Sequence, residues 1–136
     1  MTWERVYTIN DYCDCPRLGV ADFEGKPHIY KCRFDEVEGE WSDEFLLSAI
    51  APDLLALVLK DWEIWLRWER AFHAGETTIK THPTLPQDRV RHEALKGLIG
   101  NRLTDPLGEA RKVKACFRYA SSDATEPEVE WLPISE

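Results

Sequence analysis

The sequence predicts a single α+β domain over residues 1–136, in which an antiparallel, open or barrel-like sheet of five to six strands is packed by two helices. Three observations predict this class: alternating apolar residues in the first fifty positions, a long tryptophan-rich helix in the middle, and renewed alternation near the C-terminus. Strands followed by helices and then by strands disfavour a doubly wound parallel sheet. A chain of 136 residues, 43% of them hydrophobic, suffices for one full core.

The first fifty residues are predicted to form strands. Alternation predicts strands over residues 3–9, 19–23 and 28–34, and the last two are joined by a hairpin turn at Glu24-Gly25-Lys26-Pro27. On the strand 28–34, one face carries His28, Tyr30, Cys32 and Phe34. Residues 35–44 hold six carboxylates and no basic residue, so they are expected to be a connection before a further strand over residues 45–50.

The best-defined element is the helix predicted over residues 52–74, which carries three of the six tryptophans. At 100° per residue, its charged side chains gather on one face and apolar side chains fill nearly all of the rest. A helix that is apolar most of the way round is largely buried. We therefore expect Trp62, Trp65 and Leu66 to be mostly buried. A proline suits the first turn, and Gly75 can adopt the left-handed conformation of a C-terminal cap.

A second helix is predicted to begin at Thr84, because Thr84 and Gln87 have the spacing of a capping box, and to end at Gly100. Arg91 projects near the middle of its apolar arc, which is made by Val90, Ala94, Leu95, Leu98 and Ile99. An arginine that points into a core needs an anion as its partner. Pairing with a carboxylate of the first helix is therefore expected.

Two closing strands complete the prediction. Alternation over residues 109–120 predicts a strand whose inward face carries Val113, Ala115, Phe117 and Tyr119. Residues 129–134 add a short final strand. The basic residues Arg111, Lys112, Lys114 and Arg118 lie on the first of these strands and are interpreted as a solvated edge.

Composition excludes several classes of protein. The formal net charge of −8 and the lack of a basic stripe argue against a nucleic-acid partner. The tryptophan-rich helix is too charged to cross a membrane. No basic-then-apolar leader opens the chain, so we expect a cytoplasmic protein whose four cysteines are free thiols, with Cys32 in the core beside Tyr30 and Phe34.

The first candidate site is the set of charges and rings on the two helices. Asp61 and Glu69 fall inside the apolar arc of the first helix, where an unpaired charge would be costly, and Arg91 is their expected partner. Two interpretations are open. The first is a buried ion pair that fixes helix packing. The second is a polar binding pocket floored by Trp62, Trp65 and Trp68, in which aromatic faces and one or two carboxylates hold a cationic or planar ligand.

The second candidate site is the segment of residues 10–19, predicted to be a loop, together with the following hairpin. Its candidate binding residues are Asp11, Tyr12, Asp14, Arg17 and His28. The alternative is a turn in which aspartates cap backbone amides and an arginine pairs with one of them. The spacing needed for a calcium loop is absent, and Cys-x-Cys lacks the usual gap of a zinc knuckle, so no metal site is assigned.

Two classes of function remain open. The first is a non-enzymatic binding or interaction module that uses an aromatic and carboxylate-lined pocket, or the acidic surface around Trp41, to contact a small molecule or a protein. The second is a small enzyme that uses Asp61, Glu69, His28 or His82 for acid–base chemistry in a cleft between sheet and helices. No nucleophile elbow and no glycine-rich phosphate loop is present, no cofactor is expected, and no family motif is matched. The oligomeric state is left open.

Overall fold

The chain has an α+β fold with two compact units, residues 1–50 with 101–136 and residues 51–100. The computed structural model describes residues 2–106 and 108–134. The first unit is a six-stranded barrel and the second is a pair of helices. The α+β prediction is therefore confirmed, and the single domain over residues 1–136 stays a prediction.

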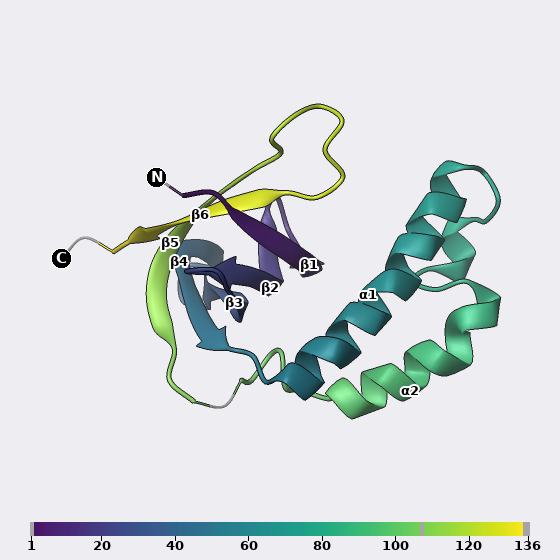
Figure 1. The fold of residues 1–136 in the computed structure, drawn as a ribbon, viewed down its shortest axis with the longest axis horizontal. Helices are drawn as coiled ribbons and strands as arrows, with labels where there is room; N and C mark the ends of the chain where they lie inside the picture. The colour runs from purple at the N-terminus through teal and green to yellow at the C-terminus, as the bar shows by residue number, and fades with distance from the viewer. Residues whose placement is uncertain (1, 107, 135–136) are drawn as a thin grey trace. The chain divides into compact units, whose positions relative to one another are not determined.

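The barrel is a closed antiparallel sheet in which each strand pairs with its neighbour in the sequence (Figure 1). Pairing of the first strand with the last closes it. The closing pair joins Glu4 and Arg5 of the first strand to Val129 and Glu128 of the last. The strands are β1 Glu4–Tyr12, β2 Pro16–Phe23, β3 Lys26–Asp35, β4 Glu40–Ala49, β5 Arg111–Arg118 and β6 Glu128–Pro133.

Side chains from all six strands fill the barrel. Its buried residues are Val6, Ala21, Tyr30, Cys32, Phe45, Leu47, Val113 and Val129. Four aromatic rings meet inside it with centroids 5.7–6.3 Å apart, those of Tyr30, Phe45, Phe117 and Trp131. These separations are typical of favourable aromatic pairs. The interior is therefore a packed core rather than a ligand channel.

Two segments that were expected to be connections are largely strand. Only residues 13–15 separate β1 from β2, and only residues 36–39 separate β3 from β4. The second turn is held by the Asp35 carboxylate, which accepts hydrogen bonds from the backbone N–H groups of Val37 and Glu38 at 2.9 and 3.1 Å. The predicted loop at residues 10–19 and the predicted connection at residues 35–44 were therefore wrong. Backbone hydrogen bonds between strands do not depend on side-chain polarity, so the strands extend beyond their apolar residues.

The side chains that were predicted to face the core of the sheet do so, except near the ends of strands. The turn after β2 is confirmed, with Glu24 and Gly25 both at positive φ. Phe34 is 48% exposed because the register shifts between Cys32 and Phe34. Tyr119 is exposed because it lies beyond the end of β5, whereas the three preceding inward residues of that strand contact the core as predicted.

The helix α1 spans Pro52–His73 without a break, as predicted. Gly75, at φ +74°, follows its C-terminal residues, and the Glu76 N–H donates to the Ala71 carbonyl at 2.8 Å. Its buried residues are Leu54, Val58, Ile64, Trp68 and Ala71. Trp62, Trp65 and Leu66 are only partly buried, less than predicted.

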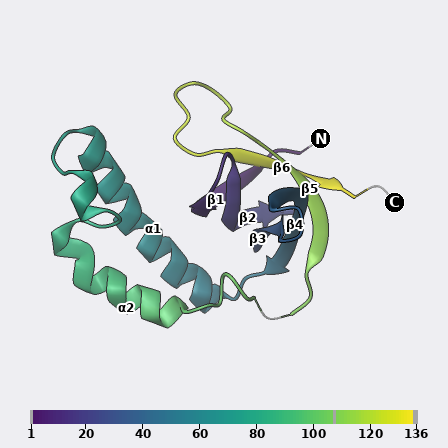
Figure 2. The ribbon, with the colours of Figure 1, turned by 180° about the vertical axis from the view of Figure 1, so that it is seen from behind.

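The second helix, α2, spans Arg89–Ile99 and lies beside α1 in both ribbon views (Figures 1 and 2). Two short 3-10 helices, Ile79–Thr81 and Pro86–Asp88, lie between α1 and α2. The predicted start at Thr84 was wrong, because the Thr84 hydroxyl donates to the Leu85 carbonyl rather than capping a helix. The predicted end at Gly100 is confirmed. No helix within the described ranges is long and apolar enough to cross a membrane.

Candidate functional site

The helical unit contains a row of aromatic rings along α1. The spacing of three, three and four residues places Trp62, Trp65, Trp68 and Phe72 on one side of a helix. Successive centroids lie 6.5, 5.2 and 5.0 Å apart. His82 approaches Trp65 and Trp68 edge-on, at 5.3 and 4.9 Å. The two predicted ring residues, Trp65 and Trp68, are therefore stacked on each other.

The charged residues of the first candidate site do not pair as predicted. The Asp61 carboxylate accepts a hydrogen bond from Nδ1 of His92 at 2.6 Å, and both side chains are mostly buried. Glu69 lies 3.8 Å from His73 on the helix surface. Arg91 is exposed, so its expected pairing with Asp61 or Glu69 was wrong.

The error came from the rotation of α2 about its axis. The buried residues of α2 are Leu95 and Ile99, and His92 precedes them by three and seven positions, which places it on the same face. Val90 and Leu98, which were assigned to the core, are 84% and 62% exposed. Arg91 therefore lies on the neighbouring solvent face, and we expect Arg91→Met to have little effect on the free energy of unfolding.

A second ion pair between the helices was missed altogether. Nε and Nη2 of Arg67 each donate to one oxygen of the Asp88 carboxylate at 3.0 Å. This bidentate contact lowers the pKa of Asp88 below its ordinary value. Arg67 belongs to the charged face that the sequence predicts for this helix, and the position of Asp88 just before α2 gives it a partner.

In the second candidate site, Arg17 is the organising residue. Its Nε donates to the Cys13 carbonyl at 2.9 Å, its Nη1 donates to Cys32 Sγ at 3.3 Å, and its guanidinium lies 4.9 Å from the centre of the Trp41 ring. It therefore ties the β1–β2 turn to β3 and β4. This contact set resembles the structural alternative that was considered, except that the arginine's partners are a carbonyl, a thiol and a ring.

The remaining loop candidates are not gathered around Arg17. Tyr12 is exposed, and its hydroxyl lies 3.5 Å from the Asp14 carbonyl. Asp14 occupies the turn at φ +66°, and Asp11 pairs with Leu18 in the β1–β2 ladder. His28 lies near the opposite turn of β2 and β3, with Nδ1 2.7 Å from the Lys26 carbonyl oxygen. These residues do not form one site with His28.

The four cysteines are free thiols, as predicted, and they are expected to differ in reactivity. Burial raises the pKa values of Cys15 and Cys32, so each carries less thiolate near neutral pH and reacts more slowly. With Ellman's reagent at about pH 8, Cys13 and Cys116 should react rapidly, Cys15 more slowly, and Cys32 only after unfolding. A Cys116→Ser variant should lose one rapid thiol. Rapid labelling of Cys32 in the folded protein would contradict the prediction.

A pocket of about 690 Å³ lies on the barrel unit and was not predicted. Its walls come from the turn after β2, from β4, from the start of β5 and from the end of β6. We call it the barrel-end pocket; its lining residues are Phe23, Glu24, Glu44, Arg111, Lys112, Val113, Trp131, Leu132, Pro133 and Ile134. These residues are far apart in the sequence, and only barrel closure brings them together.

The floor of the barrel-end pocket is anchored in the core. Val113 is buried, and Phe23 and Trp131 pack against the core cluster. The Trp131 indole N–H donates to the Asp22 carbonyl at 2.8 Å, which holds the ring in place. The Arg111 guanidinium lies 5.2 Å from the centre of the Phe23 ring, within the range of a cation–π contact. These contacts hold Phe23, Val113 and Trp131 in place as part of the barrel core.

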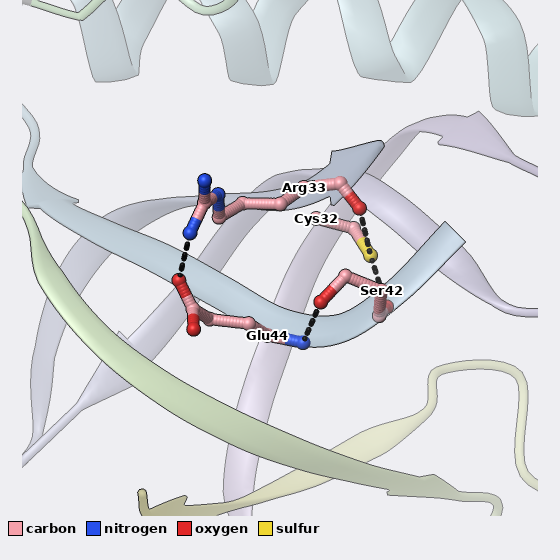
Figure 3. A network of polar contacts seen from close by, with 4 residues as sticks. All are labelled: Cys32, Arg33, Ser42 and Glu44. Carbon is pink, nitrogen blue, oxygen red and sulfur yellow. Dashed lines mark hydrogen bonds and ion pairs between the residues drawn. The ribbon is translucent and has the colours of Figure 1, made fainter. Parts of the chain in front are cut away.

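One carboxylate of this pocket is already neutralised. Arg33 donates to the Glu44 carboxylate at 2.6 Å, and Figure 3 shows the two side chains meeting between β3 and β4. The backbone N–H of Glu44 donates to the Ser42 hydroxyl at 3.0 Å, while the Cys32 thiol donates to the Ser42 carbonyl at 3.1 Å. This network fixes the β4 wall of the pocket.

Within residues 2–106 and 108–134, no three His, Cys, Asp or Glu side chains lie close enough to hold a metal ion. Comparison of the chain with protein-family models, with curated proteins and with solved structures finds no significant match.

Proposed function

We propose that this protein is a non-enzymatic binding module whose ligand site is the barrel-end pocket. The observation that carries the proposal is the hollow of about 690 Å³, which falls within the size range of small-molecule sites. A floor that is part of the packed core supports it, because a preformed site does not have to be ordered when the ligand binds.

The composition of the pocket favours an amphipathic small molecule. The aromatic faces of Phe23 and Trp131 and the side chains of Leu132 and Pro133 supply apolar contact, while charged groups stand at the rim. Ligand sites commonly combine a mainly apolar lining with a few polar groups. The rings of Trp65 and Trp68, by contrast, are engaged with each other and with His82.

A fragment screen followed by two-dimensional NMR on the ¹⁵N-labelled full chain tests this proposal. Binding should shift the indole N–H signal of Trp131 and the backbone amides of Val113 and Leu132 in a saturable way. Leu132→Asp should weaken binding, since it places a charge against the apolar wall. Shifts confined to the indoles of α1, or no saturable shifts at millimolar fragment, would contradict the proposal.

A small acid–base enzyme is the second candidate, and the Asp61–His92 contact favours it. A carboxylate that accepts from Nδ1–H fixes the tautomer and leaves Nε2 as the base. Hydrolysis of p-nitrophenyl acetate should then fall toward the background rate in His92→Ala and persist in His73→Ala, which removes an exposed histidine. Equal rates in the wild type and His92→Ala would exclude this role.

A further inference from the structure

We infer that the barrel-end pocket selects amphipathic organic anions, that is, molecules with an aromatic or aliphatic body and one carboxylate or sulfonate. The inference rests on the proposed function and adds the charge of the ligand. It comes from the distribution of ion pairs along β5, which carries four basic residues, namely Arg111, Lys112, Lys114 and Arg118.

Two of these four cations have carboxylate partners. Lys114 Nζ lies 3.4 Å from Asp43, and Arg118 Nε lies 3.3 Å from Glu128. Arg111 and Lys112, the two that line the pocket, have no carboxylate within ion-pair distance in the described part of the chain. The unpaired cations of β5 are therefore gathered at the pocket.

The carboxylates of the pocket do not cancel this charge. Glu44 is paired with Arg33 at 2.6 Å, which leaves Glu24 in the turn after β2 as the other acidic side chain of the lining. Among the described residues that line the pocket, two cations and one carboxylate thus have no ion-pair partner, on a protein whose formal net charge is −8. A local excess of positive charge on an acidic chain attracts an anion to this place and repels it elsewhere.

The position of Arg111 suits an anion above an apolar floor. Its guanidinium lies over the Phe23 ring, which leaves the fork of N–H donors available at the rim. Lys112 is exposed and has a mobile ammonium group on a long stem. A ligand whose rings contact Phe23 and Trp131 can therefore place its anionic group against the Arg111 donors, while Lys112, on the other face of β5, adds to the positive charge nearby.

A pair of matched fluorescent probes tests the inference. 8-Anilinonaphthalene-1-sulfonate has the ring system of N-phenyl-1-naphthylamine and adds a sulfonate. Each is titrated against the folded full chain, with binding located by the NMR indole signal of Trp131. We expect the sulfonate to bind at least about tenfold more tightly than the neutral probe, the effect of one charge-assisted contact.

Variants of β5 then assign the preference to the pocket. Arg111→Gln and Lys112→Gln should each weaken binding of the sulfonate several-fold more than they weaken binding of the neutral probe. Lys114→Gln is the matched control, since it removes a cation of the same strand that already has a partner, and it should change neither affinity. Circular dichroism checks that each variant is folded.

The outcomes separate the two proposals. Equal affinity for the two probes at Trp131 would overturn the anion preference and leave the binding module standing. Tighter binding of the neutral probe would do the same. Failure of both probes to shift the Trp131 signal would overturn the preference and count against the pocket as a ligand site. Loss of sulfonate binding in Lys114→Gln equal to that in Lys112→Gln would show non-specific attraction to β5 and overturn the inference.

Discussion

Replacement of Gly19 by alanine is expected to destabilise the barrel severely. A Cβ atom at this position would lie inside contact distance of the Thr8 carbonyl oxygen and 2.7 Å from the Tyr30 hydroxyl. That hydroxyl donates to the same carbonyl at 2.8 Å in the buried interior. Backbone cannot move aside as a flexible side chain can, so we expect a loss of at least about 3 kcal/mol, the upper end of ordinary overpacking effects.

Urea denaturation followed by circular dichroism measures this effect, and Gly97 provides the matched control. Gly97 lies inside α2, and a Cβ added there meets nothing within 4 Å. Gly97→Ala should therefore be neutral or stabilise the protein by up to about 1 kcal/mol, because alanine has the higher helix propensity. If Gly19→Ala unfolds at the same urea concentration as the wild type, the close approach of β1, β2 and Tyr30 is wrong.

Trp68→Ala should cost about 3–5 kcal/mol, the usual range for removing a large buried aromatic side chain. Trp68 is buried, stacks between Trp65 and Phe72, and donates its indole N–H to the Thr81 hydroxyl at 2.8 Å. The truncation would leave a cavity in the helical unit and remove one hydrogen-bond donor to the Thr81 hydroxyl. The midpoint of thermal or urea unfolding is the measurement.

Two further substitutions separate the contributions of Trp68. Trp68→Phe retains a ring in the stack and removes the indole N–H, so its loss should be clearly smaller than that of Trp68→Ala. Trp62→Ala should also cost less, because Trp62 is only partly buried at the end of the row. A Trp62→Ala variant as unstable as Trp68→Ala would show that the row contributes to stability as a whole, contrary to this prediction.

Trp131 contributes both to the barrel core and to the barrel-end pocket, so it serves as an NMR signal and is not itself substituted. Its ring packs against the barrel core and also lines the barrel-end pocket. A Trp131 substitution would change the free energy of unfolding and the ligand site together. Lys112, in contrast, is exposed and contributes charge rather than packing, so its replacement changes the rim alone.

The sequence by itself determined those features that depend on neighbours within a few residues. The helix from Pro52, its end near Gly75, and the turn at Glu24-Gly25 follow from local periodicity and from backbone preferences of glycine and proline. The long alternating segments likewise predicted most of the strands. These signals are readable in one dimension because the interactions responsible for them are local.

Only the tertiary structure decided which partners meet. Leu95 and Ile99 set the buried face of α2, and this rotation placed His92 rather than Arg91 opposite Asp61. Neighbouring residues differ by about 100° around a helix, and the apolar residues of α2 are too mixed with polar ones for the sequence to show which of the two faces inward. Closure of the barrel joined residues 23–24, 111–113 and 131–134 into one pocket. Such contacts depend on the register and packing of segments distant in the chain, which leave no local pattern in the sequence.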